Sequence, residues 1–304
     1  MPSRKSPPLL VGSASLLMLA GCVQLMAPKS ALEQRPLANP WAQESGLFYP
    51  LDIGNHWGYE YTSSFQIIPS GGPAGNPDVI ESLVDVDVTG TAERFGRTYL
   101  VQRESDGQGY EAEFLYRQDK SGLFNADPEP ASMKALAQRD EVLTRLVGDA
   151  TPSMKEAYRA AMARVIAKQN AVRKALHGAG HGGAAIGQTS GPLAGEIALL
   201  RYPIATGKTW HVREDPLVVY TVEAQESLQL PAGTLNGWRI RIDWPGFFGP
   251  EDHAAVWYGR DGRLQLRAHV ESEATDENGN VIGTVVGDDV QQLSEVSLVK
   301  KDPS

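Results

Sequence analysis

The sequence predicts a mainly β protein of the α+β class, in which an inserted helical hairpin interrupts an antiparallel sheet. Two observations carry this prediction. Residues 49–125 and 196–304 alternate β-branched and aromatic residues with polar ones, and Gly, Pro, Asn and Asp separate the segments, as in strands joined by turns. Residues 129–177 instead repeat apolar residues at helical spacing. The regular succession of strand and helix that indicates a parallel sheet is missing from the sequence.

Residues 1–21 have the features of an export signal. Arg4 and Lys5 precede an apolar run, Leu9 to Ala20, that is too short to span a bilayer. The run ends in Leu-Ala-Gly-Cys22, which resembles the lipobox of bacterial lipoproteins. The resemblance implies that residues 1–21 are removed and that Cys22 becomes the lipidated first residue of the mature protein, with palmitate and diacylglycerol as its anchor.

Cys22 is the only cysteine of the chain, so no intramolecular disulfide can form. A single cysteine in an exported protein needs an explanation, and lipidation supplies one better than a buried thiol does. The next residue is Val23 and not Asp. By resemblance to lipoprotein sorting signals, this implies a bacterial outer-membrane location, with the domain on the periplasmic side.

The charge and composition of the chain restrict the classes of partner that it can bind. The full chain has a net charge of −9, and loss of Arg4 and Lys5 with the signal takes it to −11. An acidic domain without a basic tail is a poor candidate for binding nucleic acid. Residues 22–48 hold three prolines and little periodicity, so we expect a tether there. Residues 49–304 then form the β domain, in which no segment reaches transmembrane length.

We expect the helical insertion to span residues 129–177 and to be followed by a Gly-rich loop at residues 178–195. Thr151 and Pro152 are suited to the cap and the first position of the second helix. Gly178 is suited to end it. The apolar face of this helix comprises Met154, Tyr158, Met162, Val165, Val172 and Leu176.

Two similar segments begin the two β halves: YPLDIGNHW, which ends at Trp57, and YPIATGKTW, which ends at Trp210. Their ionisable positions differ, whereas Pro, Gly and Trp recur, so we interpret the pattern as a way of starting a strand. Further along, Asp261-Gly262 and Asn278-Gly279 are typical hairpin turns.

These segments also carry a family resemblance. YPLDIGNHWGY, LQLPAGTLNGW and VWYGRDGRLQL resemble the YPLxxGNxW, PAGT and WYxxxG motifs of poorly characterised bacterial envelope lipoproteins. The resemblance spans residues 49–125 and 197–270 and excludes the helical insertion. It implies the curved antiparallel sheet, or half-barrel, of envelope lipoprotein carriers.

No motif in the sequence predicts catalysis. A nucleophile elbow after the signal, a His-Glu-x-x-His motif and a phosphate-binding loop are all missing, and lipidation would occupy the one cysteine. We therefore expect no catalytic residues and no cofactor. We also expect no metal site, because Gly178 and Gly180 separate His177 from His181 and because neighbouring strand residues such as Asp252 and His253 point to opposite faces.

Aromatic residues are the main candidates for ligand contact. Trp57 and Trp210 either line an apolar cavity on the concave face of the sheet or fill its core. Trp244, Phe247 and Phe248 lie between Pro and Gly residues, in a loop where large apolar side chains can be exposed. Exposed apolar patches mark interaction sites, so this loop is the preferred contact.

The second helix of the insertion is basic in an otherwise acidic protein. It carries Lys155, Arg159, Arg164 and Lys168. These side chains form either a docking surface for anionic lipid or an acidic partner, or an ordinary solvated face.

Together these observations predict a non-enzymatic, outer-membrane-anchored lipoprotein that binds or carries an apolar ligand or an envelope component. Two alternatives remain: an accessory subunit that joins an envelope complex through the helical hairpin, and a hydrolase whose site is assembled from scattered residues. The predicted partners are the membrane, through Cys22, and a lipid or envelope protein.

Overall fold

The computed structural model describes residues 49–126, 142, 145–147, 150–177 and 195–299. The signal segment, Cys22, the tether and the C-terminal residues 300–304 lie outside them. In the described part of the chain, twelve strands form one antiparallel sheet, which confirms the predicted β class. They are β1 (His56–Pro69), β2 (Asp78–Arg94), β3 (Arg97–Ser105), β4 (Glu111–Asp119), β5 (Gly122–Ala126), β6 (Glu196–Arg201), β7 (Thr209–Glu214), β8 (Leu217–Leu230), β9 (Gly233–Asp243), β10 (His253–Gly259), β11 (Gly262–Thr275) and β12 (Val281–Ser297).

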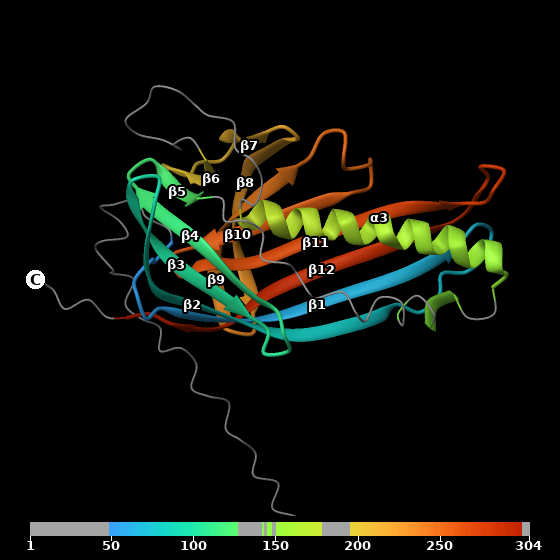
Figure 1. The fold of residues 1–304 in the computed structure, drawn as a ribbon, viewed down its shortest axis with the longest axis horizontal. Helices are drawn as coiled ribbons and strands as arrows, with labels where there is room; N and C mark the ends of the chain where they lie inside the picture. The colour runs from blue at the N-terminus through green and yellow to red at the C-terminus, as the bar shows by residue number, and fades with distance from the viewer. Residues whose placement is uncertain (1–48, 127–141, 143–144, 148–149, 178–194, 300–304) are drawn as a thin grey trace, which may run out of the picture. The chain divides into compact units, whose positions relative to one another are not determined.

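The order of the strands is β6-β5-β4-β3-β2-β1-β12-β11-β10-β9-β8-β7. Each half of the chain is thus a meander, and the two meanders join where β1 pairs with β12 (Figure 1). The end strands β6 and β7 approach each other, because the indole Nε1 of Trp210 in β7 donates to the carbonyl oxygen of Ala198 in β6 at 2.9 Å. The sheet is therefore nearly closed, like a barrel.

Strand periodicity explains which side chains face the inside. In β2, Val84, Val86 and Val88 are buried, whereas Leu83 and Asp85, which alternate with them, are exposed. The predicted hairpin dipeptides occupy the turns between β10 and β11 and between β11 and β12. Gly262 and Gly279 there have φ values of 106° and 81°, which only glycine adopts readily.

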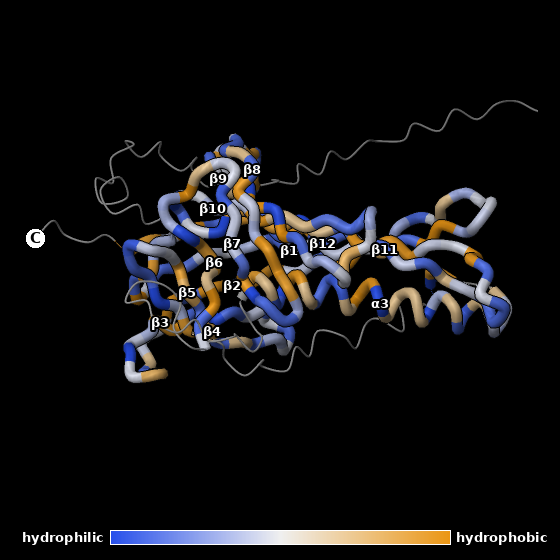
Figure 2. Tube along the Cα trace, turned by 90° about the horizontal axis from the view of Figure 1, so that it is seen from above, coloured by the Kyte–Doolittle hydropathy of each residue, from blue (hydrophilic) through white to orange (hydrophobic). Residues whose placement is uncertain are grey.

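Helix α3 (Pro152–His177) lies along β11 and β12 (Figure 1). Thr151 begins it as expected, since the amide of Met154 donates to its Oγ1 at 3.4 Å. Polar and apolar segments alternate along the helix (Figure 2). The predicted apolar face is the one that packs on the sheet: Tyr158, Met162, Val165, Val172 and Leu176 are buried, and Met154 is partly buried.

Two glycines of β12 make room for the helix. A Cβ atom at Gly283 would lie 2.6 Å from the hydroxyl of Tyr158, and one at Gly287 would lie 2.9 Å from Nε2 of Gln169 and closer still to Val165. Both distances are shorter than van der Waals contact. The helix therefore sits directly on the backbone of β12 at these points. No local pattern in the sequence distinguishes these two glycines from those of turns.

The predicted helical hairpin is described only in part. Residues 142 and 145–147 are helical and Val142 is buried, but most of residues 129–149 lie outside the described residues. The Gly-rich segment at residues 178–194 lies outside them as well. The hairpin and the loop therefore remain predictions, whereas the second helix is present.

Candidate functional site

A pocket of about 550 Å³ lies between helix α3 and the segment that joins β9 to β10. Its walls come from three parts of the chain: the second half of α3, the β7–β8 turn and the aromatic loop after β9. The described residues that line it are Ala167, Asn170, Ala171, Lys174, Pro216, Trp244, Pro245, Gly246 and Phe247. Its volume falls within the range of about 300–1,000 Å³ that is typical of small-molecule sites.

The aromatic loop forms one wall of the pocket. The carbonyl oxygen of Trp244 accepts hydrogen bonds from the amides of Phe247 and Phe248 at 3.1 and 3.0 Å, which folds the loop into a tight turn. The rings of Trp244 and Phe247 lie 4.9 Å apart, and those of Phe247 and Phe248 lie 6.3 Å apart. The structure thus brings all three predicted contact residues together, two of them in the pocket wall.

The three aromatic side chains differ in burial. Trp244 is only 6% exposed, and its Nε1 donor has no hydrogen-bond partner among the described residues. Phe248 packs against both core clusters, whereas Phe247 is 36% exposed. An indole donor buried without an acceptor is costly, at about 1–3 kcal/mol. Phe247 is thus the exposed apolar side chain of the loop, and the indole Nε1 of Trp244 is a buried donor without an acceptor among the described residues.

Helix α3 forms the opposite wall with small side chains. Ala167, Asn170, Ala171 and Lys174 are three, four and seven residues apart and so share one side of the helix. The two alanines leave the space that the pocket occupies. Lys174 is exposed and is the one ionisable side chain among the described residues that line the pocket.

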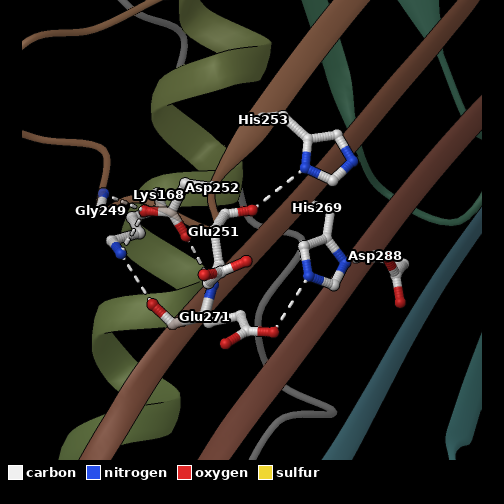
Figure 3. Close-up of polar contacts among 8 residues, drawn as sticks. All are labelled: Lys168, Gly249, Glu251, Asp252, His253, His269, Glu271 and Asp288. Atoms are coloured by element: carbon white, nitrogen blue, oxygen red, sulfur yellow. Dashed lines mark hydrogen bonds and ion pairs between the residues drawn. The ribbon is translucent and has the colours of Figure 1, made fainter.

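Asp252 holds the helix and the loop together. Its carboxylate is 1% exposed and pairs with Nζ of Lys168 at 2.5 Å, and it also accepts from the amides of Gly249 and Glu271 at 2.6 and 2.7 Å (Figure 3). Lys168 donates a second bond to the carbonyl oxygen of Glu271 at 2.7 Å. This charge pair therefore links the two pocket walls directly.

The other three residues of the predicted docking surface differ in what they contact. Arg164 donates to Oγ of Ser272 and to the carbonyl oxygen of Glu273, so its side chain turns to the sheet as that of Lys168 does. Arg159 pairs with Glu156 on the exposed side, with side chains 55% and 72% exposed. Lys155 is partly buried near the start of the helix. The predicted docking surface is thus not a single face, because two of its four members bind the sheet.

Trp57 and Trp210 are buried among core residues. Trp57 is 0% exposed and donates to the carbonyl oxygen of Asp261, and Trp210 is 7% exposed. Nearby, Arg263 and Glu104 form an ion pair at 3.2 Å with both side chains 4% exposed. The space between this pair and the surrounding tyrosines leaves no room for a water molecule. Burial there raises the pKa of Tyr258 to about 12. In this region, side chains fill the concave face of the sheet and leave no cavity.

A histidine cluster on the outer face of the sheet was not identified from the sequence. His269 of β11 contacts Asp288 at 2.7 Å through Nδ1 and Glu271 at 3.2 Å through Nε2, and its ring stacks on that of His253 with centroids 4.9 Å apart (Figure 3). Burial by itself lowers the pKa of His269, but the bonds to Asp288 and Glu271 outweigh it and raise the pKa above its ordinary value.

The histidine cluster could not be read from the sequence because its members come from three strands. Only the cross-strand register, in which His253 faces His269 and His269 faces Asp288, brings them together. The described residues contain no group of three or more His, Cys, Asp or Glu side chains arranged to hold a metal ion. The pair His177 and His181 falls outside this test, because residue 181 is not described. No described helix is both long and apolar enough to cross a membrane.

Comparisons with known proteins add little to this geometry. No family model matches the chain, and no curated protein matches it. Among solved structures, a proposed lipoprotein from Parabacteroides distasonis matches with a TM-score of 0.29 and 10% identity, over 82% of this chain and 98% of its own.

A proposed exported protein with a YmcC-like fold from Bacteroides fragilis matches with a TM-score of 0.29 and 11% identity, over the same shares of the two chains. Lipovitellin, in a structure concerned with lipid–protein interactions, matches with a TM-score of 0.30 and 6% identity, over 84% of this chain and 26% of its own. Structural similarities with TM-scores this low do not indicate a function. Evidence about function therefore comes from the geometry of the site.

Proposed function

We propose that this protein is an outer-membrane-anchored lipoprotein of the bacterial envelope, which binds an apolar ligand or envelope component without converting it chemically. The lipobox at Cys22 supports the location. The pocket between α3 and the aromatic loop carries the proposal about binding, because aromatic, proline and alanine side chains line a space of about 550 Å³.

The site proposed here differs from the one that a half-barrel suggests. Where Trp57 and the tyrosines around Arg263 face the inside of the sheet, side chains fill the space. The pocket lies instead beside α3, which the ion pair between Lys168 and Asp252 links to the aromatic loop. Binding at this place needs no opening of the packed core, and Phe247 already presents apolar surface to an incoming ligand.

The test measures binding of octan-1-ol, a soluble apolar probe, to the full-length protein by ligand-observed NMR. Ala171→Leu should weaken binding at least about tenfold, because a side chain on a helix leans toward the preceding turn and would enter the pocket over Ala167. Phe247→Ala should also weaken binding, through loss of apolar contact, at little cost in stability because the ring is partly exposed.

Ala163→Leu is the matched control. Ala163 is exposed on the same helix, one turn before Ala167, and does not line the pocket. It should bind octan-1-ol as the unaltered protein does. The proposal fails if the unaltered protein does not bind the probe, or if Ala171→Leu and Phe247→Ala both bind it with unchanged affinity while remaining folded.

A further inference from the structure

We propose that the natural ligand of this pocket is an anionic amphiphile, whose apolar part lies against Trp244 and Phe247 and whose negative group lies beside Lys174. This inference rests on the proposed function, since it names the chemical class of the ligand for the same site. It is carried by the distribution of charge around the pocket and not by any likeness to another protein.

Lys174 differs from the basic residues that precede it on α3. Lys168 pairs with Asp252, and Arg173 pairs with Asp289 at 2.7 Å, both across buried contacts with the sheet. Lys174 is exposed and has no acidic partner in the described part of the chain. No described acid neutralises its ammonium group, whereas the charges of Lys168 and Arg173 are paired with Asp252 and Asp289.

The rest of the pocket wall is uncharged. The described lining includes no acid, and Asp215, which precedes Pro216 in the sequence, is not part of it. Ala167 and Lys174 are seven residues apart, so the wall extends along about 10 Å of helix at a rise of 1.5 Å per residue. One end of this wall is apolar and the other carries a single positive charge, which is the arrangement that an amphiphile with one anionic group would match.

The C-terminal end of α3 weakens the attraction of Lys174 for an anionic ligand. Carbonyl groups of the last turn of α3 carry partial negative charge and disfavour an anion, so the charge of Lys174 must first offset them. Lys174 is also solvated, and exposed charge pairs are weak. We therefore expect Lys174 to favour an anionic ligand over a neutral one of the same chain length by only about two- to fivefold at low ionic strength, and by less in 0.5 M salt.

The test compares three probes that share an eight-carbon chain: octan-1-ol, octanoate and octyl phosphate. Their dissociation constants are measured on the full-length protein, on Lys174→Met, and on Lys120→Met. Lys120 is an exposed lysine in the β4–β5 turn and does not line the pocket, so this variant controls for the loss of one positive charge.

The expected result is tighter binding of the anionic probes by the unaltered protein and by Lys120→Met, and loss of this preference in Lys174→Met, where the anionic probes bind no more tightly than octan-1-ol. A preference for octanoate alone would assign a carboxylate head and a preference for octyl phosphate alone a phosphate head, and both support the proposal. A preference that persists in Lys174→Met overturns it. Equal binding of all probes by the unaltered protein overturns the inference but leaves the proposed function intact, whereas no binding of any probe removes both.

Discussion

Lys168 of helix α3 and Asp252 of the β9–β10 segment form an ion pair of 2.5 Å in which the aspartate is 1% exposed. The two residues are 84 positions apart in the chain. Asp252 also accepts two backbone amides, one from the aromatic loop and one from β11. A single carboxylate therefore joins helix, loop and sheet.

Removing either member of this pair should destabilise the protein, and the two losses should differ. Asp252→Ala leaves two amides without an acceptor and Lys168 without its counter-charge, with only the carbonyl oxygen of Glu271 to bind, so we expect a loss of about 3–5 kcal/mol in the free energy of unfolding. Lys168→Met should cost less, because the carboxylate keeps both amide bonds. Arg159→Met, which breaks an exposed pair on the same helix, should cost less than about 1 kcal/mol.

Urea denaturation followed by circular dichroism measures these three losses. The expected order is Asp252→Ala, then Lys168→Met, then Arg159→Met. Equal losses for Asp252→Ala and Arg159→Met would show that the buried pair does not anchor the helix.

A side chain at Gly287 should push α3 away from the sheet. Gly287→Ala places a Cβ against Val165 and Gln169, and overpacking of this kind costs about 1–3 kcal/mol. Val165→Ala in the same chain should restore part of the loss, because it removes the closest of these contacts. Thermal unfolding of the single and double variants measures both effects.

Gly90→Ala in β2 is the matched control for Gly287. Its Cβ would meet nothing within 4 Å, and its φ is not positive. The variant should therefore be neutral or slightly stabilising. If Gly287→Ala were as stable as Gly90→Ala, the close contact between helix and strand would be refuted.

His269 should make the stability depend on pH in a defined direction. Its pKa is raised in the folded protein, so its charged form contributes stability that is fully present below the unfolded pKa of about 6.5 and is lost as the pH rises through the folded pKa. His269→Gln should thus lower the free energy of unfolding more at pH 5.5 than at pH 8.5. Because the contacts are partly solvated, the difference should not exceed about 1 kcal/mol.

His253→Gln removes the ring that stacks on His269 and keeps the two carboxylate contacts of His269, so it distinguishes the two kinds of contact. His253 is exposed and its Nδ1 lies 3.1 Å from the carbonyl oxygen of Glu251, with no carboxylate bond among those described. The two carboxylate contacts of His269 remain in His253→Gln, so the pH dependence that His269 causes should persist in this variant. Urea titrations of both variants at the two pH values measure this, and a loss for His269→Gln that is larger at pH 8.5 would contradict the sign.

Cys22→Ser should abolish the membrane anchor. We expect loss of radiolabelled palmitate incorporation, because the lipobox resemblance makes the thiol of Cys22 the site of acylation. Val23→Asp should move the protein from the outer to the inner membrane on a density gradient, whereas Ala27→Asp should not. Unchanged labelling of Cys22→Ser would refute the lipoprotein prediction.

Much of the local structure follows from the sequence. The alternation in β2, the hairpin dipeptides at Gly262 and Gly279, and the cap at Thr151 are short-range signals, since the residues that create each feature are neighbours in the chain. The loop from Trp244 to Phe248 was also located from neighbouring residues, but of its three aromatic side chains only Phe247 is exposed as expected, whereas Trp244 is 6% exposed. Its role as a contact stays a prediction. Short-range signals could not show whether Trp57 and Trp210 fill the core or line a cavity, because a tryptophan in either position follows the same strand pattern.

The sequence alone determined the β class, the position of the second helix and its apolar face, and the expectation of a lipid anchor, because strand alternation, helical periodicity and the lipobox are local patterns. Only the tertiary structure decided where the helix lies and what its charges do. Gly283 and Gly287 receive α3, Asp252 and Asp289 bind two of its cations, and Lys174 stays at the rim of a pocket. These contacts join residues far apart in the chain, and the antiparallel register across β12, β11 and β10 brings them together.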